Sequence, residues 1–286
     1  MLLLRVLAKL PFSVLYLLSD FLFFVSFRVI KYRRAIVWDN LKNSFPNKDH
    51  EELRIIERNF YANLCDYAVE TLKLLSISKD ELSRRMSYSN PEILQPYANR
   101  NQSVILMASH QFNWEWLMVS GSVNLPLRLD FIYQRVSSQS FDHLIMQCRT
   151  RFGGYPIERK QTAREVIKRK NITRAIAIVA DQFPSHEKKH WVPFLNQETA
   201  FFLGLGQLTV LTQCPAFFVR SKKIKRGYYE AEIIPLTVPP YEKGSQMVVD
   251  KYAAVTESFI KEQPDNWLWS HARWKHKREA DQPIST

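Results

Sequence analysis

Residues 103–116 read SVILMASHQFNWEW and contain the change of pattern that decides the fold. The first part of this stretch is apolar and rich in β-branched residues, which is typical of a buried strand. Asn113 is a favoured helix N-cap, so we expect a helix over 113–122 with Glu115 in its first turn, where a carboxylate suits the helix dipole. The stretch therefore predicts a strand, a turn that carries His110, and a helix.

The alternation of strands and helices continues toward the carboxyl end. We expect further strands at 129–134, 175–180, 216–220 and 228–235, and helices near 138–151, 161–170, 200–212 and 245–262. Before the opening stretch, helical spacing of apolar residues from Asp39 to about Arg85, with a break at Pro46, predicts a helical prelude. Strands interleaved with helices predict an α/β fold, with a central mixed sheet flanked by helices.

The amino terminus carries an apolar segment. Residues 10–27 contain a single charge, Asp20, and as a helix they would measure about 27 Å, just short of a hydrocarbon core of roughly 30 Å. Basic residues follow the segment at Arg28, Lys31, Arg33 and Arg34. If the helix spans a membrane, the positive-inside rule places the rest of the chain in the cytoplasm. A helix that lies in the membrane interface fits the same segment.

These patterns divide the chain into three parts. We expect a membrane-anchoring or interfacial helix over 1–34, a helical amino-terminal region over 35–100, and an α/β domain over 101–286. The chain has 40 Lys and Arg against 28 Asp and Glu, a formal net charge of +12. Such a balance favours an anionic partner, which means nucleic acid, acidic lipid or an acidic protein.

Several classes of site are excluded. The three cysteines, Cys65, Cys148 and Cys214, lie far apart and match neither a zinc site nor a disulfide framework. The sequence has no phosphate-binding loop, no dinucleotide fingerprint and no nucleophile elbow. It also has no recognisable nucleic-acid-binding motif, and an apolar amino terminus serves no purpose in such binding, so we expect no nucleic-acid partner.

His110 and Glu115 are the candidates for chemistry. On one helix their side chains would point about 140° apart, so they can meet only across the predicted turn. A histidine whose second ring nitrogen is held by a carboxylate is the geometry of a general base that takes a proton from a hydroxyl. The alternative is a histidine satisfied by backbone groups and a glutamate solvated on a helix.

The sequence HQFNWE at 110–115 resembles the HX4D/E motif of the lysophospholipid-type acyltransferases. More specifically, the chain resembles the bacterial lipid A late acyltransferases over nearly its whole length. Besides this motif and the apolar segment, the resemblance is carried by NLKNSFP at 40–46, YQR at 133–135, Arg149 and Arg151 before Gly153, Asp181 with Gln182, VPF at 192–194 and WLWSHARWK at 267–275. Phe112 stands where the family commonly has glycine, and we expect its ring to fill part of the acyl or acceptor site.

The resemblance implies an O-acyltransferase. His110 would take the proton of an acceptor hydroxyl, Glu115 would orient His110, and backbone amides or an arginine would stabilise the oxyanion. The expected donor is an acyl thioester of acyl carrier protein or coenzyme A, and the acidity of the carrier protein suits a basic chain. The expected acceptor is an anionic membrane lipid or glycolipid such as a lipid A precursor. We expect no metal and no other cofactor.

Five further residues complete the predicted site. We expect Asn113, Arg135, Arg149, Arg151 and Asp181 to bind substrate, because guanidinium groups offer paired donors to anionic oxygens and strand ends gather ligands. A solvated helix face and an ordinary cap are the alternatives for the arginines and for Asp181. The resemblance also implies a location at the bacterial inner membrane, with the catalytic domain on the cytoplasmic side.

Alternatives of other kinds stay open at this point. An acyltransferase of another lipid, such as an aminolipid or a lysophospholipid, would share the chemistry. A basic membrane- or nucleic-acid-binding protein without chemistry would instead show binding that weakens steeply with salt and is indifferent to His110. The basic stretch 220–226, between two predicted strands, fits either a solvated hairpin turn or a docking element for anionic headgroups or an acidic carrier protein.

Overall fold

The computed structural model describes residues 2–184, 188–279 and 282–284. Its helices are α1 (Leu2–Ala8), α2 (Phe12–Phe23), the π-helical η1 (Phe24–Val29), α3 (Arg34–Ser44), α4 (His50–Lys73), α5 (Lys79–Arg85), η2 (Pro91–Leu94), α6 (Gln95–Asn99), α7 (Trp114–Asn124), α8 (Gln139–Thr150), η3 (Arg159–Gln161), α9 (Thr162–Lys168), α10 (Gly204–Thr212), α11 (Met247–Glu262) and η4 (Pro264–Asn266). Its strands are β1 (Met86–Tyr88), β2 (Val104–Ala108), β3 (Arg128–Tyr133), β4 (Tyr155–Glu158), β5 (Arg174–Val179), β6 (Lys189–Phe194), β7 (Gln197–Phe202), β8 (Ala216–Lys225) and β9 (Tyr228–Thr237).

Seven of the described strands form one mixed sheet in the order β1-β9-β8-β2-β5-β3-β4. The hairpin of β8 and β9 is antiparallel, while the neighbours from β8 through β2, β5 and β3 to β4 are parallel, as are β1 and β9. The predicted mixed α/β fold is therefore confirmed. Parallel pairing brings the carboxyl ends of β2, β5 and β3 to one edge of the sheet, where α/β proteins collect their ligands.

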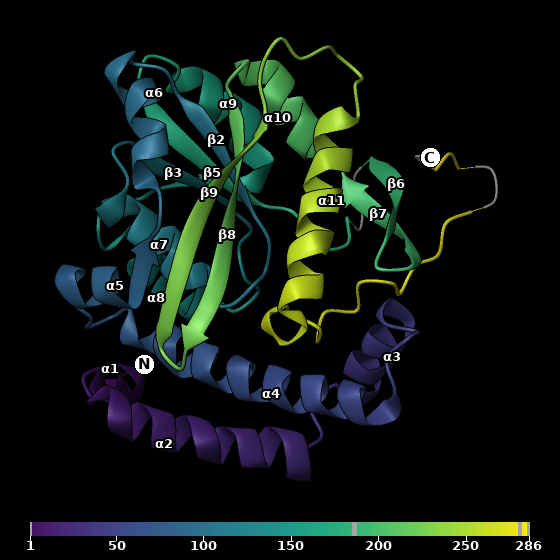
Figure 1. The fold of residues 1–286 in the computed structure, drawn as a ribbon. Coiled ribbons are helices and arrows are strands. Elements are labelled where there is room, and N and C mark those ends of the chain that lie inside the picture. Colours follow the sequence, from purple (N-terminus) through teal and green to yellow (C-terminus); the bar gives the residue numbers. More distant parts are fainter. Residues whose placement is uncertain (1, 185–187, 280–281, 285–286) are drawn as a thin grey trace.

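Helices pack against the sheet, and two of them, α4 and α2, lie beyond one end of it. Figure 1 shows α4 running past the hairpin end of β8 and β9, with α2 along α4 on the side away from the sheet. In the same view α11 stands beside the sheet, and the separate β6–β7 hairpin lies beyond it. Strand β2 lies inside the sheet, and all five of its residues are buried, as its continuous apolar run predicts.

The predicted elements differ from the structure where strands are short or polar. Strands β1, β4 and β6 were not expected, and β1 lies inside the region 35–100 that was expected to be helical. A helix was predicted from residue 200, but β7 continues to Phe202 and α10 begins at Gly204. Residues 200–202 are apolar and are compatible with a helix or a strand, and their pairing with β6 places them in a strand.

The apolar amino-terminal segment forms one continuous helix over Phe12–Val29, with a mean hydropathy of 1.7 and 17% of its residues buried. Within the described residues it is the one helix long and apolar enough to cross a membrane, which is consistent with membrane anchoring. One polar side faces α4: Ser19 donates a hydrogen bond to Asp66 at 2.8 Å, and Tyr16 donates to Glu70 at 3.0 Å. Leu17, Phe21 and other large apolar side chains of this helix are exposed.

The basic stretch 220–226 forms the end of β8 and the start of the turn to β9, so the hairpin of the first interpretation is present, although most of the stretch lies in the strand and is not exposed. Much of its charge is paired within the protein. Lys223 and Arg226 both contact Asp66 of α4, Arg226 also contacts Asp20 of α2, and Arg220 contacts two glutamates, Glu232 and Glu262. The hairpin therefore ties the sheet to the two helices below it.

Candidate active site

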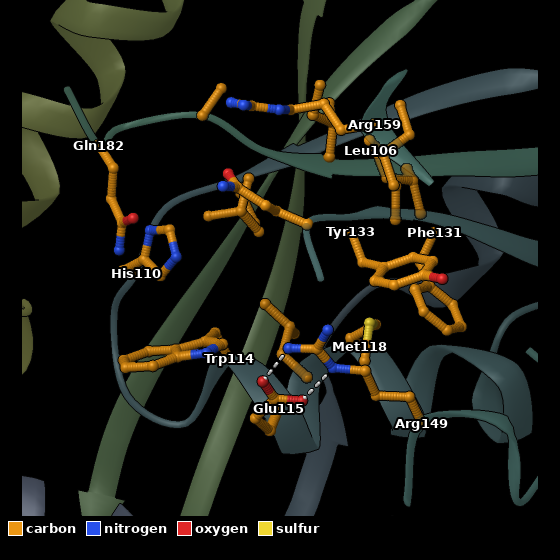
Figure 2. A pocket seen from close by; sticks show the side chains of 18 of the residues that line it. Leu106, His110, Trp114, Glu115, Met118, Phe131, Tyr133, Arg149, Arg159 and Gln182 are labelled. Carbon is orange, nitrogen blue, oxygen red and sulfur yellow. Dashed lines mark hydrogen bonds and ion pairs between the residues drawn. The ribbon is translucent and has the colours of Figure 1, made fainter. Parts of the chain in front are cut away.

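A cavity of about 540 Å³ opens where β2, β3 and β5 end beside α7. Its interior is lined by apolar side chains, among them Leu106, Leu117, Met118, Leu129 and Phe131, and its polar lining includes His110, Glu115, Gln134, Arg135, Arg149, Arg159 and Gln182. In Figure 2 His110, Trp114 and Gln182 lie at one side of this cavity, and Met118, Phe131 and Tyr133 lie at the other. The arrangement combines an apolar interior with polar and charged groups.

Hydrogen bonds to the carboxyl-terminal segment and a helix cap hold the turn between β2 and α7 in place. Leu268 donates its backbone N–H to the carbonyl of His110, and Phe112 donates to the carbonyl of Asn266, so the carboxyl-terminal segment pairs with the turn. Asn113 caps α7 as predicted, because its side-chain oxygen accepts from the N–H of Trp116 at 3.0 Å. These contacts fix the direction in which His110 leaves the sheet.

His110 is held by Asp181, which follows β5. The ring Nδ1 of His110 lies 2.6 Å from Oδ1 of Asp181, and the backbone N–H of His110 donates to Oδ2 at 2.9 Å. The indole N–H of Trp267 donates to the same Oδ2 at 2.6 Å. Burial opposes ionisation of Asp181, but His110 and these hydrogen bonds outweigh it and lower the pKa of Asp181 to about 2.

An ionised Asp181 assigns the tautomer of His110. The carboxylate only accepts hydrogen bonds, so Nδ1 carries the proton and Nε2 carries the lone pair of the neutral ring. The side chain of His110 is 19% exposed, whereas that of Asp181 is 1% exposed. A base with its lone pair at a cavity and its other nitrogen on a buried carboxylate can accept a proton from a bound hydroxyl.

The predicted contact between Glu115 and His110 is wrong. Glu115 is 3% exposed, and both its oxygens bind the guanidinium of Arg149, with Nε of Arg149 at 2.9 Å from Oε2. Figure 2 shows this pair below the cavity. Burial would lower the pKa of Arg149, but Glu115 raises it, so the guanidinium stays charged at the cavity. Glu115 therefore pairs with Arg149, and Asp181 makes the contact with His110 that was expected of Glu115.

The other predicted site residues divide into two groups. Arg135 and Arg149 line the cavity, and Arg135 is exposed and paired with Glu158 at 3.1 Å. Arg151 is not part of the cavity lining and donates through Nη1 to the backbone carbonyls of Leu74 and Ile77, just beyond α4, so its contact with substrate stays a prediction.

Two further corrections concern the motif turn itself. Asn113 is fully buried and is not part of the cavity lining, and its amide caps α7 and donates to Glu70 at 2.8 Å, so its contacts are with the fold rather than with the predicted substrate. Phe112 is also fully buried, and its ring packs against Phe60, Tyr67 and Trp114. The ring therefore belongs to the core, and the space beside His110 is bordered by Trp114 instead.

Sequence reasoning missed several residues at the cavity. Trp114, Arg159, Gln182 and Phe183 line it, although none of them was assigned a role. Gln182 and Phe183 follow Asp181 directly, so their position just after a predicted strand is the feature of the sequence that could have indicated them. Phe183 donates its backbone N–H to Nε2 of His271 at 3.2 Å, which fixes this part of the lining to the carboxyl-terminal segment.

Comparison with known proteins gives two findings. The family profile described as "Bacterial lipid A biosynthesis acyltransferase" matches residues 1–276. The chain is also similar to "Lipid A biosynthesis acyltransferase 2" of Shigella flexneri, at 21% identity over 249 residues, which cover 83% of this chain and 75% of that protein. The profile match includes the amino-terminal helices as well as the residues that form the cavity.

Two substitutions separate the roles of the carboxylates. Asp181→Asn removes the charge that stabilises an imidazolium, so we expect acyl transfer to fall by roughly 10²- to 10⁴-fold. Glu115→Gln leaves the His110–Asp181 pair in place, so its loss should be smaller than that of Asp181→Asn. The measurement is the rate of acyl transfer by wild type and both variants at saturating donor. Thermal melting of each protein is the control for folding. A larger loss for a folded Glu115→Gln protein would return the role to Glu115.

Acid stability tests the contact of His271. Burial, followed by the charge of Arg273, lowers the pKa of His271 from 6.5 to about 4. Folding therefore favours the neutral ring, which contributes stability above pH 6.5 that is lost as the pH falls toward 4. His271→Gln keeps an acceptor for Phe183 but does not titrate, so its urea stability should vary less than that of wild type across this window. If the free energy of unfolding changes with pH in the same way for the two proteins, His271 is not the titrating group.

Proposed function

Because this chain belongs to the bacterial lipid A biosynthesis acyltransferase family, we propose that it transfers a fatty acyl group from an acyl thioester to a hydroxyl of a lipid A precursor or a related glycolipid. The observation that carries the proposal is a single cavity in which the His110–Asp181 pair adjoins an apolar interior. The pair supplies a base for a hydroxyl, and the interior suits a hydrocarbon chain.

The reaction follows from the tautomer of His110. Nε2 takes the proton of the acceptor hydroxyl as its oxygen attacks the thioester carbonyl, and Asp181 stabilises the imidazolium that forms. The tetrahedral intermediate then collapses, its carbon–sulfur bond breaks, and the imidazolium returns the proton to the leaving thiolate. Arg149, held charged by Glu115, faces the same cavity and would stabilise the oxyanion or bind a phosphate of the acceptor.

The apolar interior supports a fatty acyl substrate. Leu106 of β2, Leu129 of β3 and Met118 of α7 come from three different elements and line one continuous space with His110. The burial of methylene groups is worth about 0.8 kcal/mol each, so a chain of ordinary fatty-acid length would gain several kcal/mol there. A site for a short polar acyl group would not need this volume or this lining.

Charge favours acyl carrier protein as the donor. The chain has a net charge of +12, and the exposed Arg135 lies at the cavity. An adjoining hollow contains Lys160 and Lys188, both exposed, together with Arg159. An acidic carrier protein complements such a surface, which speeds the encounter and orients the thioester toward the opening.

The domain order that we propose places the reaction at a membrane. The exposed apolar helix α2–η1 would anchor residues 1–34 at the bacterial inner membrane, with 35–100 as a helical connection and the α/β domain of 101–286 on the cytoplasmic side. Acyl carrier protein and a membrane-bound acceptor would then meet at the cavity. The exposed apolar side chains of α2 support this placement.

Lipid analysis tests the proposal in the cell. We expect mass spectrometry of total membrane lipids to show a lipid A species that loses one acyl chain when the gene is deleted and regains it with the wild-type gene. His110→Ala should not restore the chain when the folded protein is present at the level of wild type. A change confined to an aminolipid or a phospholipid would identify a different acceptor, and restoration by His110→Ala would contradict the mechanism.

A further inference from the structure

Another hollow lies away from the catalytic cavity, lined by residues of α3, of α4 and of the turn that precedes α3. It measures about 340 Å³ and is lined by Lys31, Arg34, Ala35, Trp38, His50, Arg54 and Glu57. An adjoining hollow shares Arg34, Arg54 and Glu57 and adds Arg28, Ile55 and Arg58 to its lining. We call the two together the basic pocket. It has no lining residue in common with the catalytic cavity.

The positive charge of the basic pocket is not balanced by its acidic residues. Glu57 is buried and its two oxygens are taken by Arg34, at 2.9 and 2.8 Å. Among the residues that the structure describes, Lys31, Arg54 and Arg58 have no carboxylate partner, and all three are exposed. The exposed Glu51 is the other acidic residue of the lining. The pocket therefore offers several guanidinium and ammonium groups to an anion.

The basic pocket adjoins exposed apolar side chains. Val29 and Ile30, at the end of the apolar helix α2–η1, are 63% and 67% exposed, and Ile55 in the pocket lining is 55% exposed. The indole of Trp38 lies against the ring of His50, with 4.8 Å between the ring centroids. Tryptophan and arginine beside an apolar surface are typical of the zone where lipid headgroups meet hydrocarbon.

The backbone gathers these groups by a tight turn. Lys31 and Arg33 adopt left-handed conformations, with φ of 54° and 51°, and α3 begins at Arg34. The turn sends the chain from the apolar helix directly into the pocket wall, while Arg33 donates to the carbonyl of Ser270 and holds the turn to the α/β domain. The pocket is thus fixed at the end of the exposed apolar surface.

From this continuity of apolar surface and unbalanced charge, we propose that the basic pocket binds the phosphate headgroup of an anionic phospholipid in the membrane. The acyl chains of that lipid would lie against Val29, Ile30 and the outer side of α2–η1. A soluble anion would use the charges but would gain nothing from the apolar side chains, so the surface favours a lipid. This site is separate from the acyl-transfer chemistry, and its occupancy would fix the domain at the membrane surface.

Vesicle binding of the full-length protein tests the site without measuring activity. We compare phosphatidylcholine vesicles with vesicles that also contain phosphatidylglycerol, using wild type, the double variant Arg54→Gln/Arg58→Gln, and the control Lys243→Gln/Lys251→Gln. The control removes the same charge from two exposed lysines outside the basic pocket. Wild type should bind phosphatidylglycerol vesicles more tightly than phosphatidylcholine vesicles. In the pocket variant the ratio of the two affinities should fall about thirtyfold, which is the effect of two basic side chains near an anionic surface.

The controls separate a built site from diffuse charge. The Lys243→Gln/Lys251→Gln protein should keep the preference, and both double variants should still bind phosphatidylcholine through the apolar helix. Equal losses in the two double variants, or an unchanged preference in the pocket variant, would overturn the proposal. Displacement from phosphatidylglycerol vesicles by inorganic phosphate, beyond that caused by sodium chloride at equal ionic strength, would identify a site for a soluble anion and would also overturn it.

Discussion

The buried carboxylate of Asp181 is the contact on which the candidate site depends. It accepts hydrogen bonds from the backbone and the ring of His110 and from the indole of Trp267. The end of β2, the end of β5 and the carboxyl-terminal segment therefore converge on one side chain that is 1% exposed. An ionised carboxylate is costly to bury unless donors surround it, so these three segments must come together for the charge to be tolerated. The same contacts set the tautomer of His110.

A second buried carboxylate joins this arrangement to the amino-terminal helices. Glu70 of α4 accepts from Asn113, which caps α7, and from the hydroxyls of Tyr229 and Tyr16. Burial raises the pKa of Glu70, and Asn113 and Tyr229 oppose that rise by donating to it. Tyr16 belongs to the apolar helix α2, so the helix that would meet the membrane shares a hydrogen-bond acceptor with the motif turn. The seating of α2 and the geometry of the turn are thus physically connected.

Local patterns in the sequence were sufficient for much of the fold. The apolar run before His110, the cap at Asn113 and the alternation of elements depend on neighbouring residues, so they could be predicted from the chain. The partner of His110 could not, because Asp181 follows a strand 71 positions later and reaches His110 only through the parallel pairing of β2 with β5. The contacts of Arg151 could not be predicted for a related reason, since its backbone partners beyond α4 become neighbours only in the folded protein.

The central structural proposal is that the acyl donor lies in the cavity with its reacting carbon beside His110, and a single experiment tests it directly. The measurement is a crystal structure with an acyl-pantetheine amide, in which nitrogen replaces the thioester sulfur. We expect the acyl chain between Leu106 and Leu129, with the amide carbonyl next to the ring of His110 and the pantetheine leaving past Arg135. A chain bound along the outer side of α2 with the cavity empty, or a carbonyl remote from His110, would contradict it.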